Sequence, residues 1–550
     1  MLSTRRSLIG MLAVTVLALT GCSGADGSGA ADAGAAAGEG GAPVEGGSMT
    51  FAVDSPFLGF DPNVTPAAQD ARVIRQVFDN LLYLDENREL QPWLATDWAV
   101  SEDGLTYTFT VREDVTFHDG TAFDADAVCY NLDRIKDPDT ASIYAIGLIG
   151  PYESCEAPDA TTAVVTMSAP YAPFLNNLTS PFLGLNSPAA AESTTPEDYT
   201  LAPVGSGPFR IESYTPNDRV VLSRYDDYDW APGNAEHSGP AHLEEMTFQI
   251  VADSTVRMGS VRGGEVNGIS AVPEEEVAAV ENDPNLMYVA TTQSGAPYQL
   301  HFNTADGPFE DQAVRQAARA ALDIDSAVEA LYMGARERAW GPLSPPTIDY
   351  DESVEGSFDF DPAAAAQLLE DAGWSEGADG VRTKGGERLE IVYAEGSPNR
   401  EKRQDLATFF EENLEAVGFD VEVLFEQTAQ LQTRQQEGAY DVLGLSLVAV
   451  DPNVLFQMYD PAFQPQPGQS GFNFSRTDVP EITEALATGQ EATDDAARAD
   501  AYQRVQQQVI EEARSVGIYV PTYSVALNGL EGLRFDAEGY PIYYDAYLSE

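Results

Sequence analysis

One stretch, residues 104–134, constrains the fold of this chain more than any other. In its first half Tyr107, Phe109 and Val111 alternate with polar residues, so that apolar side chains lie on one face and polar ones on the other. This two-residue period is typical of a β-strand with one buried face. Residues 115–117 resume the apolar pattern after an acidic break, which predicts a second short strand.

A turn and a helix are predicted next. Asp119-Gly120 suits a tight turn, and Asp124 is placed to cap a helix that ends at Asp137-Pro138. An earlier helix is predicted over residues 67–82, where apolar residues recur every four positions. Strand, turn and helix packed this tightly indicate a scaffold rather than a reaction centre.

The spelling of this stretch is distinctive. YTFTVREDVTFHDGTAFDADAV, residues 107–128, closely resembles the signature of the family 5 solute-binding proteins of ABC importers, which include dipeptide-, oligopeptide-, nickel- and sugar-binding members. A second block, residues 298–323, resembles the same family and predicts a strand followed by a helix capped by Asp311. With shorter matches in the same order, the resemblance covers about residues 48–548.

The resemblance implies a mixed α/β fold of the periplasmic-binding-protein type, with two lobes around a ligand cleft (cluster C) and an extra third domain. Lobe I would be discontinuous, built from residues 49–75, 201–292 and 518–550. Residues 76–200 would form the additional domain, and residues 293–517 would form lobe II.

The start of the chain is typical of an exported lipoprotein. Arg5-Arg6 precedes a short apolar run, and Leu-Thr-Gly-Cys ending at Cys22 resembles a lipobox, so residues 1–22 are predicted to be a signal peptide whose cysteine is acylated. Paired arginines fit both twin-arginine and ordinary export signals. Residues 23–48 are rich in Gly and Ala and predict a flexible tether. We therefore expect an extracytoplasmic protein held at the cell membrane by its lipid anchor alone.

Cysteine usage predicts one disulfide. With Cys22 assigned to lipid, Cys129 and Cys155 remain, which is an even pair in an exported chain. Closing such a loop stabilises a fold by roughly 3 kcal/mol in the chain-entropy model. The alternatives are two buried thiols or a metal site, although no histidine lies near either cysteine in the sequence.

The charge of the chain excludes some partners. It has 29 basic and 89 acidic residues, a net charge of −60. A surface this acidic repels phosphate backbones, so no nucleic-acid partner is expected. The charge is typical of solubility or of adaptation to salt, and attraction of a cationic solute is the alternative.

The sequence lacks the common motifs of metalloenzymes and serine hydrolases. The four histidines do not have metal-ligand spacing, and no Gly-x-Ser-x-Gly elbow occurs. We therefore predict no catalytic residue, no metal and no cofactor, and keep an exported hydrolase on the same scaffold as the remote alternative.

Candidate walls of the ligand site come from three aromatic residues and one segment. Phe57 and Phe60 lie in a loop that borders the cleft in the resembled family, and Trp340 stands in Ala-Trp-Gly-Pro. The alternative for each of these candidates, including the segment named next, is core or loop packing. The segment of residues 443–453 carries the remaining candidates, Leu445, Ser446, Val448 and Asp451.

The last segment departs from the family's peptide binders. In those proteins a Trp and then an Asp precede a later Asp-Pro, and the first Asp pairs with the peptide's α-ammonium. Aligned on Asp451-Pro452, the Trp position becomes Leu445 and the Asp position becomes Val448. A peptide ammonium would be unpaired there, which is costly, unless another acid such as Asp451 substitutes.

The resemblance implies a monomeric receptor that closes on a solute and presents it to ABC permease subunits. Oligopeptides are the leading ligand class. Oligosaccharides or another small organic solute are the alternative for the same receptor role.

Overall fold

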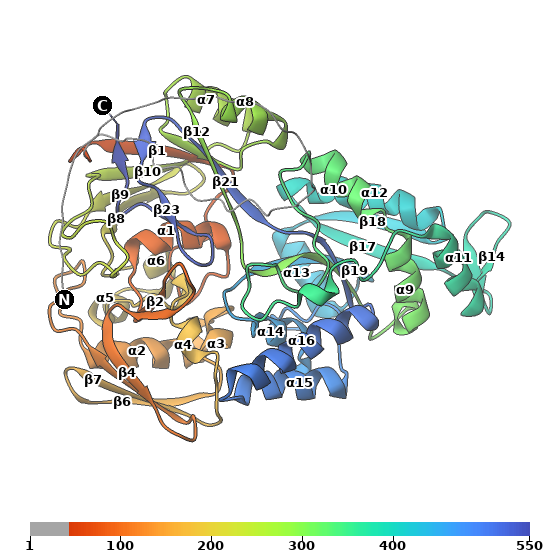
Figure 1. Cartoon of the computed structure of the whole chain (residues 1–550), viewed down its shortest axis with the longest axis horizontal. Coiled ribbons are helices and arrows are strands. Elements are labelled where there is room, and N and C mark those ends of the chain that lie inside the picture. Colours follow the sequence, from red (N-terminus) through yellow and green to blue (C-terminus); the bar gives the residue numbers. More distant parts are fainter. Residues whose placement is uncertain (1–42, 550) are drawn as a thin grey trace, which may run out of the picture. The chain divides into compact units, whose positions relative to one another are not determined.

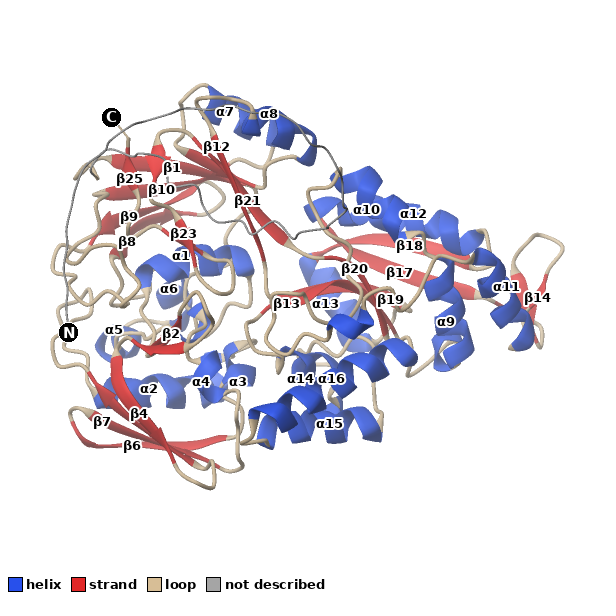
Figure 2. Ribbon diagram, viewed as in Figure 1, coloured by secondary structure: helices blue, strands red, loops and turns tan. Residues whose placement is uncertain are grey.

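The computed structural model describes residues 43–549 (Figure 1). The predicted signal peptide, Cys22 and residues 23–42 of the predicted tether lie outside these residues, whereas Ser48, the last residue of the predicted tether, begins β1. Within them, strands and helices alternate along the chain (Figure 2). The structure is therefore mixed α/β, as expected.

A seven-stranded mixed sheet contains strands from distant parts of the chain. β1 runs parallel to both β10 and β11, and the remaining pairs are antiparallel. The strand order is β12 (Met287–Thr292), β21 (Thr522–Leu527), β11 (Gly268–Ser270), β1 (Ser48–Val53), β10 (Glu245–Ile250), β9 (Arg219–Arg224) and β8 (Phe209–Thr215).

A five-stranded mixed sheet is built from the second half of the chain. β17 is parallel to β18 and β19, whereas β13 is antiparallel to β19 and β20. Helices α12 and α13 pack against β17 and β18. The strand order is β18 (Asp420–Gln427), β17 (Glu390–Ser397), β19 (Val442–Val448), β13 (Gly295–Phe302) and β20 (Ser515–Tyr519).

The distinctive stretch lies in a four-stranded antiparallel sheet covered by helix α2. The order is β4 (Ala95–Val100), β5 (Thr106–Val111), β7 (Thr162–Met167) and β6 (Tyr152–Asp159). Small sheets pair β2 (Leu82–Leu84) with β3 (Leu90–Pro92), β22 (Leu530–Glu531) with β25 (Tyr547–Leu548), β23 (Arg534–Phe535) with β24 (Pro541–Ile542), and β14 (Ser375–Glu376), β15 (Arg382–Lys384) and β16 (Glu387–Arg388) with one another.

Helices cover these sheets and fill the connections. In the first half of the chain they are α1 (Ala68–Val77), α2 (Ala125–Lys136), α3 (Ala145–Leu148), α4 (Phe174–Asn177), α5 (Pro188–Ser193), α6 (Pro196–Leu201), α7 (Ser254–Arg262) and α8 (Val277–Glu281). In the second half they are α9 (Gln312–Ala321), α10 (Ile324–Tyr332), α11 (Pro362–Asp371), α12 (Arg403–Glu415), α13 (Thr428–Glu437), α14 (Val454–Tyr459), α15 (Pro480–Glu491) and α16 (Asp495–Glu511).

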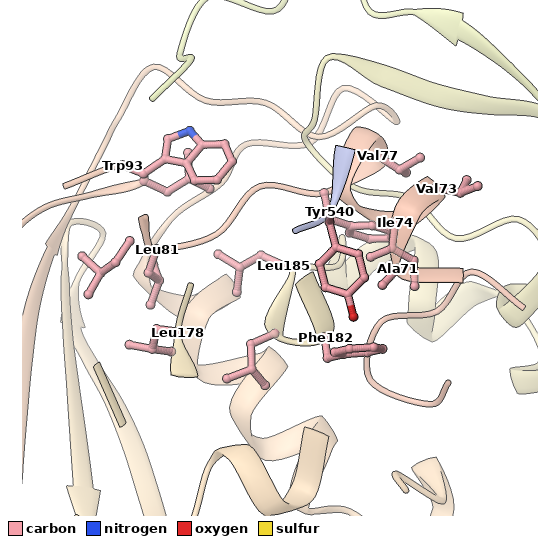
Figure 3. Packing of buried hydrophobic residues seen from close by; sticks show 14 of the residues in the cluster. Ala71, Val73, Ile74, Val77, Leu81, Trp93, Leu178, Phe182, Leu185 and Tyr540 are labelled. Atoms are coloured by element: carbon pink, nitrogen blue, oxygen red, sulfur yellow. The ribbon is translucent and has the colours of Figure 1, made fainter. Parts of the chain in front are cut away.

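The buried apolar side chains form separate clusters around the different sheets. One buried cluster joins the seven-stranded and four-stranded sheets, and another belongs to the five-stranded sheet and its helices. Figure 3 shows part of the first cluster, where Ile74 and Val77 of α1 and Phe182 lie near Tyr540 from the end of the chain. Such burial is the main stabilising term for both regions.

The local predictions are largely confirmed. The faces of β5 alternate as expected, with Tyr107, Phe109 and Val111 buried. The Asp124 carboxylate accepts a hydrogen bond from the Ala127 amide at 3.0 Å and caps α2. Asp311 caps α9 in the same way through the amide of Ala313.

Two local predictions were wrong. The helix predicted to Leu82 ends at Val77, because the following residues bond to distant parts of the chain: the Asn80 amide donates to the carbonyls of Leu178 and Ser180. The strand predicted over residues 115–117 is reduced to an isolated bridge between Thr116 and Ala122, since the Asp119-Gly120 turn follows too closely for a ladder to form.

Candidate functional site

The chain passes between the seven-stranded and five-stranded sheets twice. β12 leads through Gln293-Ser294 into β13, and β20 leads through Val520-Pro521 into β21. The two connections are joined, since the Gln293 amide donates to the Pro521 carbonyl at 2.9 Å. A pair of short strand-to-strand connections is a suitable place for a hinge.

The larger cavity has a volume of about 580 Å³ and lies beside these connections. Arg75, Thr292, Val450 and Glu538 are among its lining residues. Its walls also contain Asp79, whose pKa burial raises to about 6 although Trp230, Ser206 and Tyr228 donate hydrogen bonds to the carboxylate.

Two neighbouring carboxyl groups at this cavity differ in their partners. Arg75 forms an ion pair with Asp536 at 2.8 Å and donates to Asn80 and to the Thr179 carbonyl. In the part of the chain that the structure describes, Glu538 accepts one long hydrogen bond, from the Ser180 hydroxyl at 3.4 Å. Burial, together with the nearby Asp536, raises the pKa of Glu538 to about 8, so this carboxyl carries a proton at neutral pH.

The smaller cavity, of about 330 Å³, is lined by residues from the regions of both large sheets. Asp54 follows β1 and Arg72 lies on α1, whereas Arg336, Arg400 and Lys402 belong to the region of the five-stranded sheet. A ligand in this cavity would contact both regions at once.

Ion pairs already cross this cavity. Glu274 meets Lys402 at 2.9 Å and Arg336 at 3.7 Å. Arg336 also lies 3.5 Å from Glu401, a partly buried carboxylate that accepts a hydrogen bond from the Tyr519 hydroxyl at 2.8 Å. Burial works to raise the pKa of Glu401, but its cationic neighbours hold it well below the usual value.

Two of the predicted binding residues are engaged by other parts of the protein. The Ser446 hydroxyl accepts a hydrogen bond from Arg403 at 2.9 Å. The Val448 carbonyl accepts one from the Tyr144 hydroxyl at 2.9 Å, which connects β19 to the start of α3. Val448 therefore lies beside an element of the predicted additional domain.

Asp451 is paired within the protein. It is 1% exposed, forms an ion pair with Arg498 at 2.6 Å and accepts a hydrogen bond from the Asn176 amide at 2.9 Å. With these partners in place, Asp451 is not free to substitute for the missing acid at Val448. Leu445 packs against two apolar clusters.

The three predicted aromatic residues pack elsewhere. Phe57 and Phe60 are buried, their ring centroids lie 5.3 Å apart, and Phe60 also meets Tyr214 edge-on. The Arg338 guanidinium covers the ring of Trp340 at 3.6 Å. None of the predicted binding residues lines either cavity, and their contact with ligand stays a prediction.

Several site residues were missed from the sequence. Arg400 had a signal, since Arg400-Glu-Lys-Arg403 places three basic residues within four positions of a strongly acidic chain. Arg72 and Glu538 had none, because each is one charged residue among many. Only the fold brings them to a cavity wall.

The predicted disulfide is confirmed. Cys129 of α2 is bonded to Cys155 of β6, which ties the helix to the sheet that it covers. Residues 43–549 contain no helix long and apolar enough to cross a membrane. In the same part of the chain, no group of three or more His, Cys, Asp or Glu side chains is arranged to hold a metal ion.

Comparison with known families assigns the chain. The model of the bacterial extracellular solute-binding proteins, family 5 (middle), matches residues 89–467. The chain belongs to this family. Its members are the solute-binding proteins of ABC importers, so the resemblance seen in the sequence is confirmed.

Curated relatives include glutathione-binding proteins named GsiB. The protein from Escherichia coli K12 is 32% identical over 326 residues, which cover 59% of this chain and 61% of the relative. The one from Pectobacterium atrosepticum is 28% identical over 469 residues, 84% of this chain and 86% of the relative. The match to the E. coli protein thus spans less than two thirds of its length.

Solved structures confirm the predicted fold class. DppA from Helicobacter pylori, in complex with the peptide STSA, has a TM-score of 0.79 at 23% identity and covers 92% of this chain and 99% of its own. AppA from Bacillus subtilis, in complex with a nonapeptide, has a TM-score of 0.79 at 20% identity and covers 92% and 100%. The chain has the fold of these periplasmic binding proteins.

Proposed function

We propose that this protein is the membrane-tethered receptor of an ABC importer for oligopeptides. Family membership over residues 89–467 carries the proposal. The glutathione-binding relatives support a peptide ligand, because glutathione is itself a tripeptide. A small organic solute is the second candidate, supported by AgaA, a structural relative from A. tumefaciens in complex with agropinic acid.

Capture in this proposal is a closure without chemistry. The two connections at Gln293-Ser294 and Val520-Pro521 allow the two large sheets to approach or separate. A ligand that contacts both sides favours the closed state by the difference in its affinity for the two states. Saturable binding of one ligand per protein without turnover supports this role, whereas turnover would favour the remote alternative of an exported hydrolase.

This protein has no acidic residue at the position where the family's peptide binders pair an Asp with the ammonium group of a free peptide. Val448 stands there, and its carbonyl is bound by Tyr144. Asp451, the nearby acid, is paired with Arg498. We therefore expect free di- and tripeptides to bind poorly and ligands without a free amine at that position to be tolerated.

Calorimetric titration of free and N-acetylated tripeptides tests this expectation. Val448→Asp should gain affinity for the free peptides, because a charge-assisted hydrogen bond would form where none exists. The gain is reduced by desolvation of the new carboxylate. Val448→Asn is the matched control, because the Asn side chain has the same shape as that of Asp but carries no charge. Micromolar or tighter binding of free dipeptides by the unmodified protein would show that the role given to position 448 is mistaken.

The membrane tether is tested separately. Cys22→Ala should release the protein from the membrane fraction without lowering its melting temperature, because the Gly- and Ala-rich sequence predicted to follow the acylation site cannot form an apolar core. A variant that remains in the membrane fraction would contradict the lipid anchor and leave the ligand proposal untouched.

A further inference from the structure

The larger cavity belongs mainly to one side of the molecule. Most of its lining residues come from the β2–β3 hairpin and from residues 534–544. Among the residues that the structure describes, Val450 is the one lining residue from the region of the five-stranded sheet. The volume of about 580 Å³ lies within the range of about 300–1,000 Å³ that is typical of small-molecule sites. The cavity is therefore large enough to hold a ligand of its own.

Acidic residues outnumber basic ones in its walls. Five acidic residues and three arginines line the cavity, an excess of two negative charges when all are ionised. Two of the arginines are paired within the protein, Arg75 with Asp536 and Arg534 with Asp545. The acidic residues are Asp79, Asp85, Glu86, Asp536 and Glu538, and the arginines are Arg75, Arg88 and Arg534.

Aromatic side chains form another part of the walls. Trp93, Tyr228 and Tyr544 are buried and line the cavity. The polar atoms of two of them are bonded within the protein, since the Trp93 indole donates to the Trp230 carbonyl at 3.1 Å and the Tyr544 hydroxyl donates to the Gly239 carbonyl at 2.7 Å. Aromatic rings provide apolar surface for an alkyl chain, and their faces attract cations.

Glu538 has fewer partners than the other buried carboxyl groups of this cavity. It is 3% exposed, its Oε2 accepts one long hydrogen bond from the Ser180 hydroxyl at 3.4 Å, and its Oε1 accepts none from residues 43–549. Asp79, by contrast, accepts three hydrogen bonds, and Asp536 is paired with Arg75. A buried carboxylate with so few donors is costly, so Glu538 needs either a proton or a cationic partner.

The charged and titratable groups around Glu538 are Asp536, Arg75, Tyr144 and Tyr540. Burial and the charge of Asp536 raise the pKa of Glu538 to about 8, while Arg75 acts in the opposite direction. Burial also raises the pKa of both tyrosines well above the usual value, so that both are neutral at pH 7. The proton on Glu538 therefore neutralises a charge that a bound cation would neutralise as well.

We propose that the larger cavity binds the primary ammonium group of a small alkylamine, with the Glu538 carboxylate as its partner. The inference concerns a second site and does not rest on the proposed receptor function. An ammonium group supplies three hydrogen-bond donors, and the aromatic walls cover its alkyl chain. Binding exchanges one positive charge for another: the O–H bond of Glu538 breaks, the proton leaves to solvent, and an ammonium N–H donates to the carboxylate.

A charged probe and a neutral probe of similar shape test the proposal. n-Butylammonium and 1-butanol are titrated at pH 7 and constant ionic strength and followed by NMR. n-Butylammonium should bind saturably with a dissociation constant of about 0.1–10 mM, as expected for so small a ligand. 1-Butanol should bind about tenfold or more weakly, because it cannot form the charged hydrogen bond. Glu538→Gln should remove this preference. Glu86→Gln, which neutralises an exposed acid of the same cavity, is the control and should keep it.

The exchange of the proton gives a second readout. The affinity for n-butylammonium should rise about tenfold from pH 6 to pH 7, because at both values the carboxyl group must first lose its proton. Calorimetry in buffers of different ionisation enthalpy should show the release of about one proton per ligand bound. Glu538→Gln should show neither effect, and Glu86→Gln should show both. Equal affinity for the two probes, or binding of n-butylammonium without proton release, would overturn the site.

Discussion

The two cavities differ in the charged residues that line them and in how those residues are paired. At the larger cavity, Arg75 is paired with Asp536, and the neighbouring Glu538 forms no ion pair among the described residues. At the smaller cavity, Arg72 and Arg400 lie among four acidic residues, and the charge of Arg400 acts on both Asp54 and Glu401. The net charge of −60 therefore says little about the sign of the charge at a given site.

The difference lies in what can restore neutrality. When buried carboxyl groups are in excess, one of them can take up a proton and lose its charge. The raised pKa of Glu538 favours its protonated, neutral form in this way. An excess of arginine cannot be relieved in this way, because a guanidinium does not lose its proton in a protein. Only another anion can balance it.

Removing one arginine from each cavity should show this difference most strongly. Arg75→Gln leaves Asp536 buried without its partner and should lower the free energy of unfolding by about 3–5 kcal/mol. Arg72→Gln removes a cation that has no ion pair among residues 43–549 and should cost less than about 1 kcal/mol. Urea unfolding of the three proteins at pH 7 measures both values. Equal losses would contradict the difference in pairing between the two arginines.

The proton at the larger cavity should appear as a pH dependence of stability. Glu538 has a folded-state pKa of about 8 against an ordinary value of 4.5, so the folded state holds the proton more tightly than the unfolded state. Stability is then full below pH 4.5 and falls as the pH rises to about 8, by up to about 5 kcal/mol for a shift of this size.

Glu538→Gln is the variant that isolates this effect. It should unfold with a flatter pH dependence than the unmodified protein between pH 5 and pH 8, because Gln cannot ionise. Thermal unfolding at several pH values compares the two. Parallel pH profiles would show that Glu538 does not hold the extra proton.

The ion pairs across the smaller cavity should contribute least. Lys402 and Glu274 are partly exposed to solvent, and salt screens such pairs. Lys402→Gln should therefore change stability by less than about 1 kcal/mol in low salt and by nothing measurable in 1 M salt. A large effect that persists in high salt would show that solvent does not screen this pair.

The fold could be predicted well from the sequence, because its signals are local. Alternation of Tyr107, Phe109 and Val111 predicts the face of β5, and Asp124 and Asp311 cap the helices that follow them. The prediction of a helix to Leu82 was wrong because Asn80 is held by carbonyls about a hundred residues away. Such contacts leave no local pattern.

The site could be predicted much less well. The sequence predicted binding residues in the segment 443–453. In the structure, however, Ser446 is bound by Arg403, the Val448 carbonyl is bound by Tyr144, and Asp451 is paired with Arg498. Glu538 is 358 positions from Ser180 in the sequence, and its importance lies in the partners that it lacks. A missing ion pair cannot be read from a sequence, since it depends on every charged group that folding brings near.

A crystal structure with n-butylammonium bound tests the central claim most directly. The account predicts the ammonium nitrogen in the larger cavity, at hydrogen-bond distance, about 2.7–3.2 Å, from a carboxylate oxygen of Glu538. An ammonium group found in the smaller cavity, or one that does not contact Glu538, would contradict it.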